Sequence, residues 1–163
     1  MPRERLNVLT DAFDRALSSD RLAEAETIVA RMASAADDPI TSAVMLRMRG
    51  QLAAAKGDSV AAAHALTRAI AEARTAGRLD LLAGGWLADL GSVRLTAGDL
   101  AGARVALEEG VEIADRVRGA DWATVRVMRL LAAVLTAQGE HAKAADVLGQ
   151  AVSSATGSRP LDP

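Results

Sequence analysis

The side chains that could perform chemistry in this 163-residue chain are carboxylates, arginines, hydroxyls and two histidines. A nucleophile needs a neighbouring base, and a metal site needs several ligands at suitable spacing. His64 and His141 lie far apart, and neither has a second metal ligand at such a spacing. The absence of cysteine excludes disulfides, thiolate zinc sites and a cysteine nucleophile. We therefore predict that the chain is not an enzyme and binds neither a metal nor a cofactor.

The arginines offer a second kind of chemistry, the recognition of carboxylates through paired N–H donors. The formal net charge is −2, so the chain lacks the excess of positive charge typical of nucleic-acid-binding proteins. Its uninterrupted apolar run at 130–137 is far too short to cross a bilayer, and the N-terminus has no apolar signal core. We expect a cytoplasmic chain that binds neither nucleic acid nor a membrane.

Three segments of the chain repeat one another without gaps and supply the elements that must position these side chains. They begin at Gly57, Gly98 and Gly139, and each glycine is followed by an acid. The matching positions along them are Ala62, Ala103 and Ala144; Leu66, Leu107 and Leu148; Ala69, Gly110 and Ala151; Ile70, Val111 and Val152. Steps of four, three and one residues mark one face of an α-helix.

The residues before each glycine also align, with Gly50, Gly91 and Ala132 at one small position. Each unit therefore reads as helix A, a glycine turn and helix B, where the acid caps helix B. With a degenerate first unit, the approximate units are 4–36, 39–77, 80–118 and 121–156. The expected helices are 4–18, 21–35, 40–56, 59–76, 80–97, 100–118, 121–138 and 141–156. We expect one domain over residues 1–156 and a disordered tail at 157–163.

These units resemble the tetratricopeptide repeat family. The motif residues are Leu87, Leu90-Gly91, Ala103, Leu107 and Gly110, and their counterparts around Gly139 and Gly57. The resemblance implies an all-α solenoid of four stacked hairpins, eight antiparallel helices in a right-handed superhelix. The glycines recur every 41 residues, whereas the family period is about 34. Longer units of this kind are similar to those in bacterial transcription activators and antibiotic-pathway regulators.

In the resembled family, a concave groove is lined by positions 2, 5, 9 and 12 of helix A. Those positions are Asn7, Thr10, Asp14 and Leu17; Val44, Arg47, Gln51 and Ala54; Gly85, Ala88, Ser92 and Leu95; Arg126, Arg129, Ala133 and Thr136. From these we take Arg47, Gln51, Ala88, Ser92, Arg126 and Arg129 as candidate partner-binding residues. The leading hypothesis is thus a non-catalytic adaptor that binds a protein or peptide in this groove.

Two other hypotheses remain open. Gly84-Gly85 inside a predicted helix costs about 1 kcal/mol per glycine relative to alanine, so it indicates either a close helix crossing or a kink that opens a pocket. Such a pocket would involve Trp86, Asp89 and Arg94, and would suit a regulatory module that senses a small effector. Arg94 could instead pair with Asp89 or Asp99. The third hypothesis is self-assembly as a homodimer, because the last helix exposes apolar residues with no capping helix.

Overall fold

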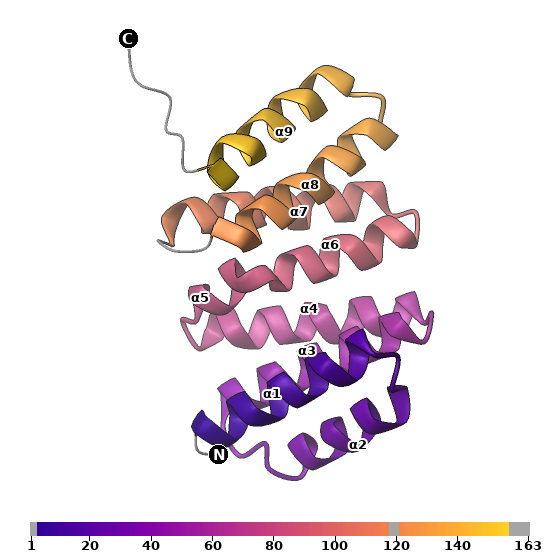
Figure 1. Ribbon diagram of the computed structural model, residues 1–163, viewed down its shortest axis with the longest axis vertical. Helices are drawn as coiled ribbons and strands as arrows, with labels where there is room; N and C mark the ends of the chain where they lie inside the picture. The colour runs from indigo at the N-terminus through magenta and orange to yellow at the C-terminus, as the bar shows by residue number, and fades with distance from the viewer. Residues whose placement is uncertain (1–2, 118–120, 157–163) are drawn as a thin grey trace. The chain divides into compact units, whose positions relative to one another are not determined.

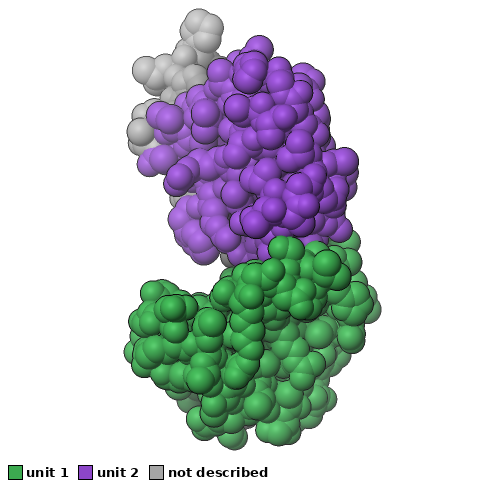
Figure 2. Space-filling view, turned by 90° about the vertical axis from the view of Figure 1, so that its right-hand side faces the viewer, with its two compact units in different colours: residues 1–78 green, residues 79–163 purple. Residues whose placement is uncertain are grey.

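The computed structural model describes residues 3–117 and 121–156, which form two compact units (Figure 2). Unit 1 spans residues 1–78 and unit 2 spans residues 79–163, and each is described by itself. Over the described residues the chain forms helices and no strand, which confirms the predicted all-α fold. The last residue of the expected helix 100–118 and the expected disordered tail at 157–163 lie outside the described residues, and the single domain over 1–156 stays a prediction.

Unit 1 consists of four helices that pack against their neighbours in chain order (Figure 1). They are α1 (Arg3–Ser18), α2 (Leu22–Ala33), α3 (Pro39–Ala55) and α4 (Ser59–Thr75). The largest fully buried side chains of this unit include Phe13, Met32, Met48 and Leu66. Each helix contributes one of these four side chains, so the core runs through the whole stack as expected when single hairpins cannot bury their apolar faces alone.

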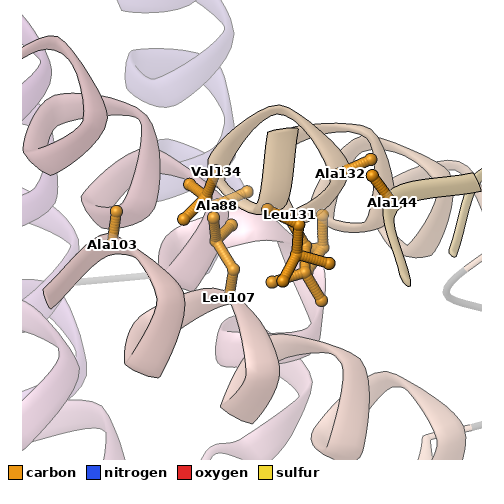
Figure 3. Close-up of a cluster of buried hydrophobic side chains, with 9 residues drawn as sticks. Ala88, Ala103, Leu107, Leu131, Ala132, Val134 and Ala144 are labelled. Carbon is orange, nitrogen blue, oxygen red and sulfur yellow. The ribbon is translucent and has the colours of Figure 1, made fainter. Parts of the chain in front are cut away.

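Unit 2 begins with a divided helix and continues with three regular ones (Figure 1). Its elements are α5 (Leu79–Leu81), the π-helix η1 (Leu82–Trp86), α6 (Leu87–Thr96), α7 (Leu100–Arg116), α8 (Asp121–Ala137) and α9 (His141–Thr156). Neighbouring helices pack together, and α6 also contacts α8. Figure 3 shows the core that results, in which Ala88 of α6 and Leu107 of α7 lie close to Leu131 of α8.

The turns within the hairpins follow the predicted chemistry. Gly98 has a φ of 79°, in the left-handed region that glycine adopts without steric cost, and closes α6. The next residue, Asp99, caps α7 by accepting a hydrogen bond from the Gly102 N–H at 2.9 Å. Asp58 caps α4 in the same way through the Ala61 N–H. The structure therefore confirms that the Gly-acid pairs are corners of the chain.

The expected single helix over 80–97 is divided into α5, η1 and α6, so the described residues form ten helical elements where eight helices were predicted. Gly85 has a φ of 102°, which a regular helix does not allow, and η1 ends one residue later. Of the two interpretations of Gly84-Gly85, a kink is therefore the observed one. A π-turn inserts an extra residue into the helix, and glycine at its strained position removes the steric penalty that a Cβ would bring.

The start of α3 is stabilised by several hydrogen bonds to the N-cap residue Asp38, which directly precedes Pro39. Its Oδ1 accepts hydrogen bonds from the N–H groups of Ile40 and Thr41, and its Oδ2 accepts one from the Thr41 hydroxyl at 2.6 Å. The hydroxyl and the backbone N–H of Thr41 lower the pKa of Asp38 from 3.8 to about 2. The carboxylate form of this residue therefore stabilises the folded state.

We expect Asp38→Ala to lower the free energy of unfolding by about 1 kcal/mol at neutral pH, because α3 loses its cap. Since the pKa of Asp38 is lower in the folded state, this contribution is complete above its ordinary value of 3.8 and is lost as the pH falls towards about 2. Urea unfolding followed by circular dichroism should show the two proteins converging over that range. Asp38→Asn keeps an acceptor oxygen and should cost less than the alanine variant. A difference that does not change with pH would contradict this account.

Candidate binding site

A buried ion pair joins α6 to α8 within unit 2. The Nη2 atom of Arg126 lies 2.7 Å from Oδ1 of Asp89, and the Asp89 side chain is only 6% exposed. Arg126 itself is 40% exposed, so its guanidinium contacts the buried carboxylate and also reaches solvent. Taking a carboxylate out of water is costly unless a partner compensates its charge. The buried negative charge of Asp89 needs a positive partner, and this ion pair therefore holds the guanidinium of Arg126 in place.

Gly85 provides the space in which this arginine lies. A Cβ atom built on Gly85 would lie 3.4 Å from Nη1 of Arg126 and 3.9 Å from Cη2 of Trp122. Both side chains thus approach the bare backbone of η1, at the residue whose φ of 102° also favours glycine. The kink and the ion pair therefore form one local arrangement, with Arg126 between Gly85 and Asp89.

Trp122 is the exposed part of the same arrangement. It lies four residues before Arg126 on α8, a spacing that places two side chains on the same side of a helix. Its side chain is 67% exposed, whereas Trp86 of η1 is buried. A large exposed aromatic ring beside an arginine is the composition found in the energetically important centres of protein interfaces.

The other candidate groove residues lie in different surroundings. Ser92 of α6 is half-buried and Arg129 of α8 is exposed. Ala88 is fully buried in the core cluster of unit 2, so its side chain lies in the interior and not on a binding surface, because α6 and α8 pack together there. Arg47 and Gln51 are half-buried on α3, in unit 1. The structure thus brings Arg126, a predicted groove residue, together with Asp89, a predicted residue of the alternative pocket.

The alternative pocket of Trp86, Asp89 and Arg94 is not assembled in the expected way. The Nε atom of Arg94 lies 3.8 Å from Oδ2 of Asp99, and its Nη1 donates a hydrogen bond of 2.9 Å to the Gly102 carbonyl. Arg94 therefore contacts Asp99, one of its two expected carboxylate partners. The other, Asp89, is paired with Arg126. Arg94 consequently joins α6 to the first turn of α7, where it supports the hairpin turn.

Sequence reasoning missed Trp122 as a site residue. The available signal was its place on the same helix side as Arg126, together with the rarity of aromatic residues in the chain. Its exposure could not be read from the sequence, because its repeat counterparts Ile40 and Leu81 are also large apolar residues and both are half-buried. The exposed aromatic ring became visible only in the folded structure.

Unit 1 contains an open hollow of about 470 Å³ between the α2–α3 connection and α4. Its lining includes Asp37, Asp38 and Glu72 around the apolar Pro39 and Ala71. Both carboxylate oxygens of Asp38 take part in capping α3, so this acid has a structural role. Over the described residues, no group of three His, Asp or Glu side chains is arranged to hold a metal, and no helix is long and apolar enough to span a membrane.

A comparison with protein families adds an independent observation to this geometry. Residues 82–156 match the sequence profile described as tetratricopeptide repeat. The match supports a tetratricopeptide-like repeat over these residues. A comparison with curated proteins finds no match. Tetratricopeptide repeats commonly mediate protein–protein interactions, and the matched residues include the whole arrangement of Gly85, Asp89, Trp122 and Arg126.

The tetratricopeptide repeat match also agrees with the helical arrangement of unit 2. It begins at the first residue of η1 and ends at the last residue of α9, so it contains both hairpins of unit 2 except for α5. In these hairpins Gly91 and Ala132 occupy the small position of helix A, and Leu107 lies in the core. The family motif therefore corresponds to the residues that pack the helices, while the residues that contact a partner are free to vary.

Proposed function

We propose that this chain is a non-catalytic, cytoplasmic adaptor whose unit 2 binds a partner polypeptide at the surface formed by Trp122 and Arg126. The single observation that carries this proposal is the exposed indole of Trp122 beside an arginine that a buried carboxylate holds in place. Arg47, Gln51, Ser92 and Arg129 remain further candidates for contacts with the partner.

The energetic properties of such a surface support the proposal. Tryptophan and arginine are enriched among the few interface residues that contribute most of the binding energy. Arg126 is positioned before the partner arrives, because Asp89 and the backbone of Gly85 restrict it. A side chain that is already ordered loses less conformational entropy on binding, which increases affinity.

The chemistry of the surface also indicates the type of partner. A guanidinium has five N–H donors, and Arg126 uses only some of them for Asp89. Because the arginine is 40% exposed, donors remain available for a carboxylate or a backbone carbonyl of the partner. Trp122 offers an apolar face next to them. We therefore expect a peptide segment that carries an acidic residue close to an apolar one.

The proposal can be tested by selecting peptides from a random displayed library on the full chain. Selected peptides are then titrated against the wild type and against Trp122→Ala by calorimetry. We expect Trp122→Ala to weaken binding by about 30-fold, which corresponds to about 2 kcal/mol for an interface centre. Replacing the acidic residue of the peptide by its amide should also weaken binding, because the amide cannot form a charged pair with Arg126.

A matched control is Val105→Ala on α7, because Val105 is 64% exposed and takes no part in the proposed surface. This variant should bind the selected peptides like the wild type. Equal affinity of Trp122→Ala and the wild type for every selected peptide would contradict the proposal, provided that circular dichroism shows both to be folded.

A further inference from the structure

The first and last helices leave apolar side chains exposed at repeat positions that are more buried elsewhere in the chain. Val8 of α1 is 63% exposed, and Val152 of α9 is also 63% exposed. In the alignment of A helices, in which Asn7 corresponds to Arg126, Val8 corresponds to Val127 of α8, which is buried. Among B helices, Val152 corresponds to Val111 of α7, which is half-buried and packs against the core cluster.

Leu148 on α9 shows the same difference. It is 44% exposed, whereas its counterpart Leu107 on α7 is fully buried. The helix that follows α7 is α8, and these two helices pack together within unit 2. In the part of the chain that the structure describes, α9 packs on α8 and keeps both Leu148 and Val152 accessible.

The contact between α7 and α8 shows which side chain of an A helix packs against the preceding B helix. A Cβ atom built on Gly110 of α7 would lie 3.1 Å from Cγ1 of Val127, so this valine packs closely against α7. The counterpart of Gly110 on α9 is Ala151, the residue before Val152. The counterpart of Val127 on the first A helix is Val8. Ala151 is itself buried, so the accessible apolar side chains of α9 are Leu148 and Val152. Their counterparts on α7 are Leu107, which shares the core cluster with Val127, and Val111, which packs against that cluster. The exposed Val8, Leu148 and Val152 therefore correspond to the two sides of a contact that already exists within the chain.

We propose that α1 of a second copy docks on α9 as α8 docks on α7, which joins copies of this chain head to tail. The partner is a second copy because α1 carries the exposed counterpart of the residue that fills this place internally. The two surfaces are different parts of the chain, so the contact is heterologous, and each added copy exposes a new docking surface. Assembly therefore continues beyond a dimer unless the geometry closes a ring.

Two acids of α1 are complementary in charge to an arginine beside the α9 surface. Ala88 of α6 lies in the core cluster with Val127 of α8. The residue of α8 that corresponds to Ala88 in the repeat is Arg129, which is exposed. On α1, the exposed acids Glu4 and Asp11 lie one helical turn before and after Val8. A docked α1 would bring these carboxylates towards Arg129. The C-terminal half of α9, residues 147–156, carries no charge that would oppose the contact.

The experiment is sedimentation velocity of the full chain from micromolar to near-millimolar concentration. The wild type should form species larger than a dimer as the concentration rises. Val8→Asp and Val152→Asp should each remain monomeric, because each loses one of the two surfaces. An equimolar mixture of these two variants should form a dimer and nothing larger, because the intact α9 of one variant can bind only the intact α1 of the other.

Val105→Asp is the matched control, since Val105 is as exposed as Val8 and should assemble like the wild type. Circular dichroism should show that all variants are folded. Arg129→Glu should weaken assembly, and so should added salt. A wild type that stays monomeric at every concentration would overturn the proposal. Assembly of Val8→Asp alone would also overturn it, because α9 would then pair with another α9.

Discussion

Arg126→Ala is expected to lower the free energy of unfolding of unit 2 by about 2 to 3 kcal/mol. The variant leaves the carboxylate of Asp89, which is 6% exposed, without the guanidinium that compensates its charge. Trp86 and Trp122 are the only two tryptophans of the chain and both belong to unit 2. Urea unfolding followed by tryptophan fluorescence therefore reports the stability of this unit.

Asp89→Asn supplies the control for this prediction, because it removes the buried charge and nearly preserves the shape of the side chain. In an Asp89→Asn background, Arg126→Ala should cost less than about 1 kcal/mol, since only a neutral hydrogen bond is lost. The difference between the two backgrounds measures the coupling of the pair. An equal cost in both backgrounds would show that Arg126 stabilises unit 2 by another route.

Gly91→Ala is expected to lower the free energy of unfolding by about 1 to 2 kcal/mol, although alanine favours a helix more than glycine does. A Cβ atom on Gly91 would lie 2.5 Å from Cγ of Leu107, a side chain that is fully buried. The leucine can give way only by displacing the surrounding core of α6, α7 and α8. The same fluorescence measurement tests this variant, because α6 carries Gly91 in unit 2.

Gly149→Ala on α9 is the matched control for this substitution. No atom lies within 4 Å of a Cβ built there, so the variant should raise the stability by about 0.5 to 1 kcal/mol through helix propensity alone. The cost of Gly91→Ala should shrink in a Leu107→Ala background, where the opposing side chain is short. Stabilisation by Gly91→Ala in the wild-type background would refute the steric explanation.

Most of the fold could be predicted from the sequence, because its signals are local. The recurrence of a glycine followed by an acid at Gly57-Asp58 and Gly98-Asp99 marks helix ends, and the structure shows the left-handed glycines and the carboxylate caps there. Each of these preferences acts within one helical turn. The apolar spacing then assigns one face of each helix to the core, and Leu107 lies there as expected.

The candidate site could be predicted only in part. The place of Arg126 in the resembled repeat predicts a surface position, and its side chain is 40% exposed in unit 2. The same reasoning predicts a surface position for Ala88, which is buried, because repeat register alone does not say how closely the next helix approaches. Trp122 is not predicted in this way, since nothing in its sequence neighbourhood distinguishes an exposed indole from a buried one.

The sequence by itself determined the helical hairpins, their corners and the small residues at their contacts, since these depend on backbone conformation and on spacing along one helix. Only the tertiary structure decided that Gly85 interrupts its helix. It also decided that Asp89 pairs with Arg126 and that Arg94 contacts Asp99. Asp89 and Arg126 belong to different hairpins. A pairing of this kind depends on which carboxylate becomes buried, and burial is a property of the packed helices.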